Sequence, residues 1–313
     1  MTQNVRVALV GLDSSHADHY VRLLNVEQRF PGVRVTVLAD GSPGRVAELA
    51  AASTAAGARV RPGGPDDVTS VDAVIVAHRA GRLHRTAALP FVRAGLPVLV
   101  DKPFTASVAD AEELVAAARA SGAVLFSCSA LRFVPGVSRL RAEAAGLGEV
   151  TGLTVTGPAD PGSAHDGLFF LGIHLVETAR ALLGGDAGLA WGEPAVGRDE
   201  DGVTATVRAT ADGRDVVVRL RFVDPALHPA QPFHTVVTTT GGSVEGELEV
   251  GPDYLEPVLA HFLAQVAGTA ASEASDGLVG PVALLAAITA ITAGLEGPAH
   301  LVPGEPAAPT VRG

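Results

Sequence analysis

The feature of this sequence that most constrains its fold is an alternation of short apolar, β-rich runs with helical stretches through about the first 125 residues. The expected strands are 5–10, 33–39, 72–77, 97–101 and 123–128, and the expected helices are 16–29, 43–57, 83–94 and 107–120. Strands joined by crossover helices pair in parallel. The pattern predicts an α/β fold that begins with a doubly wound Rossmann sheet, in a dinucleotide-binding domain of residues 1–126.

The pattern changes in the second part of the chain, where apolar and polar residues alternate with a period of two. The expected strands there are 149–157, 203–210, 214–223, 233–240 and 243–250, with helices at 135–145, 168–183, 255–267 and 281–294. This alternation is typical of an antiparallel sheet with one covered face. We therefore expect an α+β domain over 127–313 with a largely antiparallel, open-faced sheet, ending in an irregular tail from Pro303.

Charge and composition exclude several classes of protein. The formal net charge is −11, which disfavours binding to nucleic acid. The single cysteine, Cys128, and the absence of a signal-peptide pattern at the N-terminus fit a cytoplasmic location.

The uncharged stretch Gly277–Leu295 is rich in Ala and contains Pro281. A buried helix that starts near Pro281 explains it better than a membrane span.

The turn after the first strand is a degenerate dinucleotide-binding motif. It reads Gly11, Leu12, Asp13, Ser14, Ser15, His16. Only the first glycine of the Gly-x-Gly-x-x-Gly pattern is present. A helix N-terminus at this place attracts phosphate, and its serine and histidine side chains can donate hydrogen bonds. Alternatively, Asp13 or Ser14 simply caps the helix.

Asp40 ends the second expected strand, where an acidic side chain binds the ribose hydroxyls of NAD. It would repel the 2′-phosphate of NADP, although Arg45 nearby weakens that preference. The alternative is an ordinary turn aspartate before Gly41.

Lys102 is the only lysine in the chain and follows the fourth expected strand in the run Asp101, Lys102, Pro103. The carboxyl ends of parallel strands line the ligand crevice of an open α/β sheet. An amine can lose its proton when its pKa is lowered, whereas a guanidinium cannot. The alternative is a surface lysine.

His174 lies in an otherwise apolar expected helix, where it is either a catalytic group or a hydrogen-bonded core residue. Its spacing from Glu177 would let the two side chains pair or share a metal. No supporting ligand cluster is evident, so no metal is expected. His165 and Asp166, just upstream, could line the same cleft.

Taken in order, these motifs resemble the family of glucose–fructose oxidoreductase, inositol dehydrogenase and rhizopine-catabolism proteins (Gfo/Idh/MocA). The resemblance implies a Rossmann domain, a second domain whose open sheet forms homodimers or homotetramers, and NAD(P)-dependent chemistry on sugars, polyols or inositols. It implies Lys102 and His174 as catalytic residues. The residues expected to bind cofactor are Gly11, Leu12, Asp13, Ser14, Ser15, His16, Asp40, Ala77, His78, His84, Asp101 and Lys102; those expected to bind substrate are Lys102, Arg132, His165, Asp166, Phe170 and His174.

Two departures from the family pattern accompany the altered glycine turn. Phe170 stands where the family often carries an aspartate, four residues before the helix histidine, and His78 and Arg79 replace a small residue and a proline.

The resulting hypothesis is an NAD-dependent oxidoreductase, with NADP disfavoured, that moves a hydride between nicotinamide and a secondary alcohol or ketone. Either Lys102, with a pKa lowered by burial or by a cation such as Arg132, or His174 is the base. The altered glycine turn and Phe170 favour one alternative, a nucleotide- or sugar-binding regulatory protein on the same scaffold. A third hypothesis is a redox-neutral lyase or epimerase that uses NAD transiently.

Overall fold

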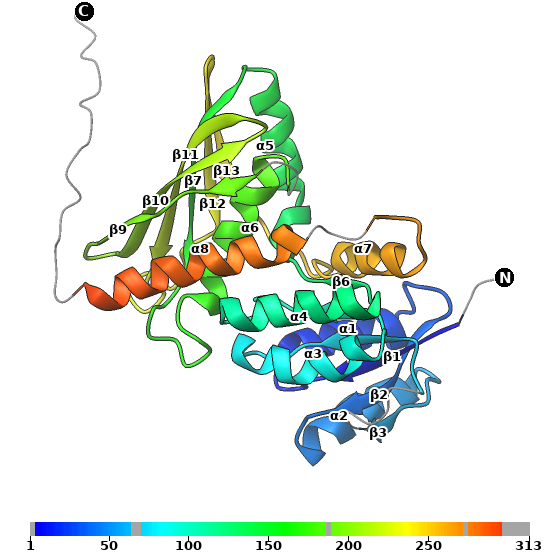
Figure 1. The fold of residues 1–313 in the computed structure, drawn as a ribbon. Helices are drawn as coiled ribbons and strands as arrows, with labels where there is room; N and C mark the ends of the chain where they lie inside the picture. The colour runs from blue at the N-terminus through cyan, green and yellow to red at the C-terminus, as the bar shows by residue number, and fades with distance from the viewer. Residues whose placement is uncertain (1–3, 64–69, 186–188, 272–274, 296–313) are drawn as a thin grey trace, which may run out of the picture.

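The first half of the chain forms a six-stranded parallel sheet. A computed structural model describes residues 4–63, 70–185, 189–271 and 275–295, which leaves the tail from Pro303 outside the described residues (Figure 1). The strands are β1 (Val5–Val10), β2 (Val33–Ala39), β3 (Arg61–Gly63), β4 (Ala73–Val76), β5 (Val98–Val100) and β6 (Leu125–Phe126). Their order β3-β2-β1-β4-β5-β6 is that of a Rossmann fold, which confirms the predicted fold class. The edge strand β3 was not predicted, because its run Arg-Pro-Gly carries no strand signal.

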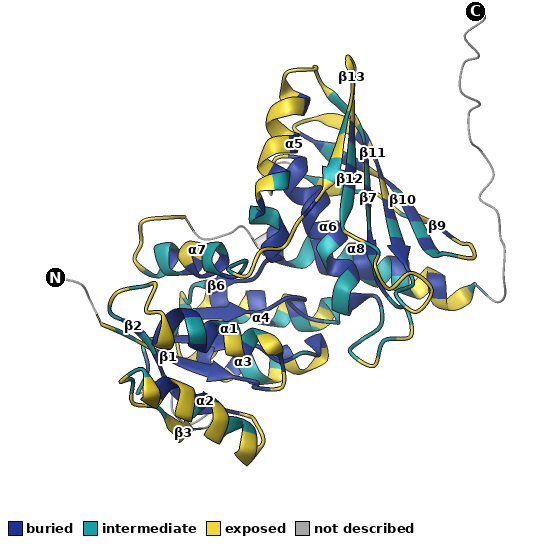
Figure 2. Ribbon diagram, turned by 180° about the vertical axis from the view of Figure 1, so that it is seen from behind, coloured by how far each residue is buried: buried dark blue, intermediate teal, exposed yellow. Residues whose placement is uncertain are grey.

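Helices flank this sheet at nearly the expected places. They are α1 (Ser15–Val21), α2 (Pro43–Ala55), α3 (His84–Arg93, after a 3₁₀ turn at Gly81–Leu83) and α4 (Val108–Ser121). The helix expected over 16–29 ends earlier, in a π-helical turn at Arg22–Val26. That turn brings the buried Asn25 against β2, where its side-chain amide bonds both the N–H and the carbonyl of Val35. The sheet itself is buried between its helices, whose outer faces are exposed (Figure 2).

The second half forms a mixed sheet in which all but one strand pair is antiparallel. Its strands are β7 (Val150–Pro158), β8 (Ala190–Trp191), β9 (Ala195–Arg198), β10 (Gly202–Ala211), β11 (Arg214–Val223), β12 (His234–Thr239) and β13 (Gly242–Glu247). The order is β13-β12-β7-β11-β10-β8, with β9 also on β10, and only β7 and β11 are parallel. The short strands β8 and β9 were not predicted.

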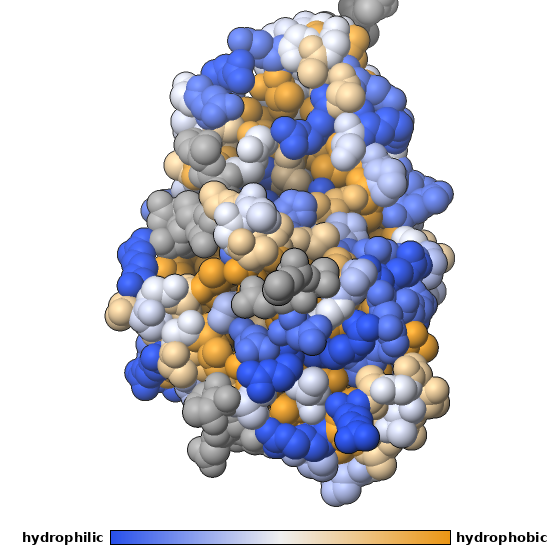
Figure 3. Space-filling model, turned by 90° about the vertical axis from the view of Figure 1, so that its right-hand side faces the viewer, coloured by the Kyte–Doolittle hydropathy of each residue, from blue (hydrophilic) through white to orange (hydrophobic). Residues whose placement is uncertain are grey.

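One face of this second sheet is covered and the other is open. Along β11, Val216, Val218 and Leu220 are buried, whereas Val217 and Arg219 between them are exposed. The helices α5 (Pro135–Ala145) and α6 (Phe169–Leu182) pack on the covered side. On the face of the molecule in Figure 3, apolar side chains gather in hollows between hydrophilic ridges.

The last helix, α8 (Ser275–Gly294), joins the two halves. It lies between α4 of the first half and α6 of the second (Figure 1) and contacts both. The stretch Gly277–Gly294 is long and apolar enough to cross a membrane, but Val282, Leu285 and Ile288 on it are fully buried in the protein core. The expected start near Pro281 is wrong, because the helix begins at Ser275 and the proline lies inside it.

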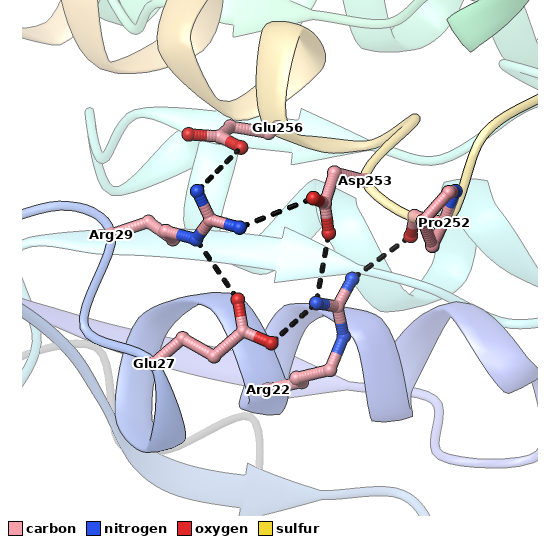
Figure 4. A network of polar contacts seen from close by, with 6 residues as sticks. All are labelled: Arg22, Glu27, Arg29, Pro252, Asp253 and Glu256. Atoms are coloured by element: carbon pink, nitrogen blue, oxygen red, sulfur yellow. Dashed lines mark hydrogen bonds and ion pairs between the residues drawn. The ribbon is translucent and has the colours of Figure 1, made fainter.

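Helix α7 (Glu256–Val266) returns to the Rossmann half. Its buried face, with Val258, Leu259 and Phe262, belongs to the same apolar cluster as Tyr20 of α1. A network of exposed charges surrounds this contact (Figure 4), made by Arg22, Glu27, Arg29, Asp253 and Glu256. The predicted domain boundary at residue 126 therefore assigns α7 to the second domain by its place in the sequence, although α7 packs on the first.

Apolar burial rather than the charge network should hold α7 in place. Phe262→Ala should lower the free energy of unfolding by about 3–5 kcal/mol through lost burial and a cavity. Arg29→Ala, the control in the exposed network, should lower it by less than about 1 kcal/mol. Urea denaturation of both variants measures the difference, and a larger loss in Arg29→Ala would contradict this account.

Candidate active site

A cleft of about 350 Å³ lies at the carboxyl edge of the parallel sheet, against the second domain. Such an edge collects side chains from the ends of several strands and from the elements facing them. The lining residues are Ser14, Ser15, His16, His78, Arg79, Asp101, Lys102, Ala130, Leu131, Phe170, Leu171, His174, Phe233, Val250, Tyr254 and Leu255. The two residues expected to be catalytic, Lys102 and His174, thus share one cleft.

Lys102 is not a surface lysine, since it is only 8% exposed. Its Nζ donates a hydrogen bond to the backbone carbonyl of Phe170 at 3.1 Å and lies 4.8 Å from the centre of that residue's ring. Burial lowers the pKa of Lys102, and the charge of Arg79 acts in the same direction against the opposing carboxylate of Asp101. The cation that acts on this amine is therefore Arg79, and not Arg132 as expected.

Asp101 is a buried carboxylate paired with an imidazole. Nδ1 of His16, in the first turn of α1, lies 2.6 Å from its Oδ2. Burial alone would raise the pKa of Asp101, but the charge and hydrogen bond of His16, with the charges of Lys102 and His84, hold it at about 2. The histidine at the third glycine position of the motif thus binds a carboxylate at the end of β5.

His174 projects from α6 and is held by a hydroxyl. Its Nδ1 shares a hydrogen bond of 2.6 Å with Oγ of the buried Ser129. Burial and the nearby charges of Lys102 and His16 lower the pKa of His174 well below its usual value, so the ring is neutral at neutral pH. His174 does not pair with Glu177, although their spacing allowed it, because Glu177 forms ion pairs with Arg180 and Arg132.

Two other expected site residues point away from the cleft. Arg132 lies behind it, against Glu177. His84 is fully buried and holds the backbone, with its two ring nitrogens 2.7 Å from the carbonyl oxygen of Pro103 and 2.9 Å from that of His78. Neither residue lines the cleft, because neighbours within the fold already hold their polar groups.

The loop before α6 joins the two domains rather than presenting a binding group. The carboxylate of Asp166 accepts hydrogen bonds from the backbone N–H of Arg82 at 3.1 Å and from its guanidinium at 2.6 Å. His165 packs against Phe170, with 5.0 Å between ring centres. Both residues therefore support the cleft from outside.

The glycine turn is built with side chains where the usual motif has glycines. Gly11 has a φ of +82°, and a Cβ there would lie 2.4 Å from Nδ1 of His78, so the position requires glycine. Ser14 caps α1 by accepting a hydrogen bond from the backbone N–H of His16, as one sequence alternative predicted. Asp13 accepts a weaker bond from the backbone N–H of Arg79, and Leu12 is buried below the turn.

The residue expected to bind the adenosine ribose has a partner within the protein. Nε2 of His78 lies 2.7 Å from one carboxylate oxygen of Asp40, whose side chain is still 68% exposed. The preceding residue, Ala77, is fully buried at the end of β4. Arg45 bonds the carbonyl of Leu12 and carboxylates on α1 and α2, so it supports the turn.

The residues at this end of the cleft fit a dinucleotide. Nδ1 of His78 is buried without a hydrogen-bond partner among the described residues. The guanidinium of Arg79 has no ion pair within the described ranges either. These two groups lie beside Ser14 and Ser15 and can donate hydrogen bonds to the anionic pyrophosphate of a dinucleotide. The exposed carboxylate of Asp40 can still accept hydrogen bonds from ribose hydroxyls. The part of the chain that the structure describes contains no group of three or more His, Cys, Asp or Glu side chains arranged for a metal.

Sequence reasoning missed several lining or supporting residues. Ser129 lies just beyond β6, so the rule that singled out Lys102, a polar residue after a parallel strand, would have found it. Phe233 and Tyr254 come from segments far along the chain. No local pattern marks either of them.

Comparison with known proteins agrees with this geometry. The sequence model of the Gfo/Idh/MocA oxidoreductase family, NAD-binding Rossmann fold, matches residues 5–128. An inositol 2-dehydrogenase of Rhodococcus erythropolis is 34% identical over 130 residues, which is 42% of this chain and 36% of that protein. Inositol 2-dehydrogenase 2 of Saccharopolyspora erythraea is 35% identical over 195 residues, 59% of this chain and 55% of that protein.

Solved structures extend the likeness of fold to nearly the whole chain. GenD2 from gentamicin A biosynthesis, in complex with NAD, superposes with a TM-score of 0.71 at 24% identity over 94% of this chain and 95% of its own. KijD10, a 3-ketoreductase from Actinomadura kijaniata in complex with NADP, superposes with a TM-score of 0.69 at 19% identity. The superposition covers 92% of this chain and 97% of KijD10.

Fold and cleft together define a protein with a Rossmann domain, a cleft at the carboxyl edge of its sheet, and a second, open-faced α+β domain. Residues 5–128, which form the Rossmann domain, match the Gfo/Idh/MocA oxidoreductase family, the family that the motifs resemble. The aligned segments span about half or less of the length of these curated relatives.

The pairing of Asp101 with His16 should make stability depend on acid. Because the folded pKa of about 2 lies below the ordinary 3.8, the stabilisation is present above about pH 4 and is lost as the pH falls toward 2. Between about pH 5 and about pH 2, wild type should lose about 2 kcal/mol more unfolding free energy than Asp101→Asn. Urea denaturation across this range measures it. His16→Ala should show the same reduced dependence, and parallel curves would contradict the pairing.

Proposed function

We propose that this protein is an NAD(P)-dependent dehydrogenase that moves a hydride between nicotinamide and a secondary alcohol or ketone of a sugar, polyol, inositol or related compound. The observation that carries the proposal is the convergence of the Lys102 amine and the His174 imidazole in one cleft at the carboxyl edge of a Rossmann sheet. Relatives named inositol 2-dehydrogenase support the class of reaction.

Lys102 is the better candidate for the base. Its pKa is lowered by burial, so a larger fraction of the amine is neutral and able to accept a proton from the substrate hydroxyl. When bound, the nicotinamide ring supplies the hydride acceptor. With that acceptor bound, Nζ of Lys102 would take the proton of the substrate hydroxyl as the alcohol is oxidised to a ketone. His174, neutral and held at Nδ1 by Ser129, orients the hydroxyl through its other nitrogen.

Asp40 and Arg45 favour NAD over NADP in this proposal. The exposed carboxylate of Asp40 would repel a 2′-phosphate. Arg45 is tied to the carbonyl of Leu12 and to two carboxylates, so it cannot offset that repulsion without losing those contacts. Solved structures of the same fold include complexes with NAD and with NADP.

Replacing Lys102 should abolish turnover but not cofactor binding. Lys102→Met and Lys102→Arg should each lower kcat by about 10²–10⁴-fold, because neither side chain exchanges a proton at this place. Bound NADH should still show its change in fluorescence. In wild type, kcat/KM for alcohol oxidation should rise with pH along a limb centred below 10.5, the ordinary pKa of lysine. Full turnover by Lys102→Met would remove this residue from the mechanism.

Ser129 should act as a positioning residue for His174. Ser129→Ala leaves Nδ1 of the buried imidazole without its partner, at a cost that corresponds to about a 10- to 100-fold loss of kcat. Ser129→Thr keeps the hydroxyl and should retain most of the activity. Steady-state kinetics with both variants tests the role, and equal losses in the two would indicate a purely steric effect.

A second candidate is a regulatory binding protein, or a lyase or epimerase that uses NAD transiently. The observation that favours it is the ring of His78, which stands over Gly11 and bonds Asp40, the two positions used by the dinucleotide motif. Titration of NADH followed by fluorescence separates the first of these: a regulator without cofactor gives no change. Net production of NADH from NAD and an alcohol excludes the redox-neutral reactions.

We further propose a cytoplasmic homodimer or homotetramer. The support is the uncovered face of the second sheet, where the apolar Val217 is 46% exposed. Light scattering on the purified protein tests the assembly.

A further inference from the structure

The two walls of the cleft differ in chemistry. The wall formed by the parallel sheet and the start of α1 carries hydroxyl, imidazole, guanidinium and carboxylate groups. The facing wall is formed by α6 and by segments near residues 131, 233 and 250, whereas Tyr254 packs on His16 of the first wall. Its apolar residues are the half-buried Phe170, Leu171 and Phe233, the exposed Val250, and Leu131, which is only 2% exposed.

Polar atoms on the apolar wall are few, and most have partners. The carbonyl of Phe170 accepts the hydrogen bond from Lys102, and Nδ1 of His174 is held by Ser129. His174 is the polar side chain that this wall contributes to the described cleft lining, and Tyr254 lies against His16 on the opposite side. Apart from Asp101, which is paired with His16, no Asp, Glu, Asn or Gln is among the described lining residues.

The aromatic side chains of this wall are held by packing. The ring of Phe233 lies 5.5 Å from that of His174 in an edge-to-face contact, and it fills the space where a Cβ on Gly157 would be. The ring of Phe170 is held between His165 and the amine of Lys102. The apolar surface beside the reacting groups is therefore preformed.

From this wall we infer the substrate class: a secondary alcohol or ketone whose carbons beyond the reacting bond are deoxygenated or alkyl-substituted, rather than a fully hydroxylated ring. The inference rests on the proposed function. A hydroxyl placed against this wall gives up its bonds to water and finds no partner. An apolar pocket of this kind rejects a ligand that carries one extra hydroxyl by about 100-fold.

The test compares the binding of two ring alcohols, cyclohexanol and myo-inositol, to the full-length protein with saturating NAD, by NMR titration. Cyclohexanol should bind at least about 100-fold more tightly. Equal or tighter binding of myo-inositol overturns the inference, as does the absence of binding by either alcohol.

Substitutions on the apolar wall test whether the preference for cyclohexanol arises from that wall. Leu171→Asn offers a partner to hydroxyl groups and should reduce the preference for cyclohexanol by about tenfold or more, whereas Leu171→Met should preserve it. An unchanged preference in Leu171→Asn would also count against the inference.

Turnover, followed as NADH formation, is measured separately. If myo-inositol is oxidised with a higher kcat/KM than cyclohexanol, the proposed function holds and the inferred substrate class is wrong. If cyclohexanol binds tightly but neither alcohol is turned over, the inferred preference for apolar substrates holds and the proposed dehydrogenase function is wrong.

Discussion

The buried carboxylate of Asp101 is the constraint on which the site depends. A charge removed from water must be paired, and His16 pairs it across the gap between β5 and α1. This contact fixes the first turn of α1 against the end of the neighbouring strand. It also places a negative charge beside Lys102 and limits how far burial can lower the pKa of that amine. One contact, between Asp101 and His16, therefore organises both the turn and the reacting group.

The second constraint is the joining of the two domains, since the cleft takes one wall from each. Helix α8 packs against both halves, and Asp166 ties the loop before α6 to the turn that carries Arg82. The hydrogen bond from Lys102 to the carbonyl of Phe170 crosses the same boundary. The amine is thus positioned by the wall against which the substrate would lie.

Side-chain contacts take over part of the usual role of glycine at the start of α1. The usual motif has one glycine that lets a cofactor approach the backbone and another that lets helix and strand pack closely. This chain has Asp13 and His16 at those positions and brings His78 over Gly11. The donors offered at this place are imidazole, guanidinium and hydroxyl groups. A site built in this way depends more on the protonation of its side chains than a backbone cradle does.

Features that depend on local pattern could be predicted from the amino-acid sequence. The alternation of strands and helices defined the parallel sheet, the period of two defined the half-covered second sheet, and a polar residue after a strand placed Lys102 at the ligand edge. The short edge strands were not predicted, because a run of two to four residues carries little periodicity. The start of α8 was predicted wrongly, because proline does not always begin a helix.

Tertiary structure alone decided which partner each polar side chain takes. His174 bonds Ser129 rather than Glu177, Arg132 turns away from the cleft, and the nitrogens of His84 meet backbone carbonyls. These choices depend on groups brought together from distant parts of the chain, and a buried polar atom bonds whichever complementary group the packing places within reach. The direction of a side chain is set by that packing, which no local spacing encodes.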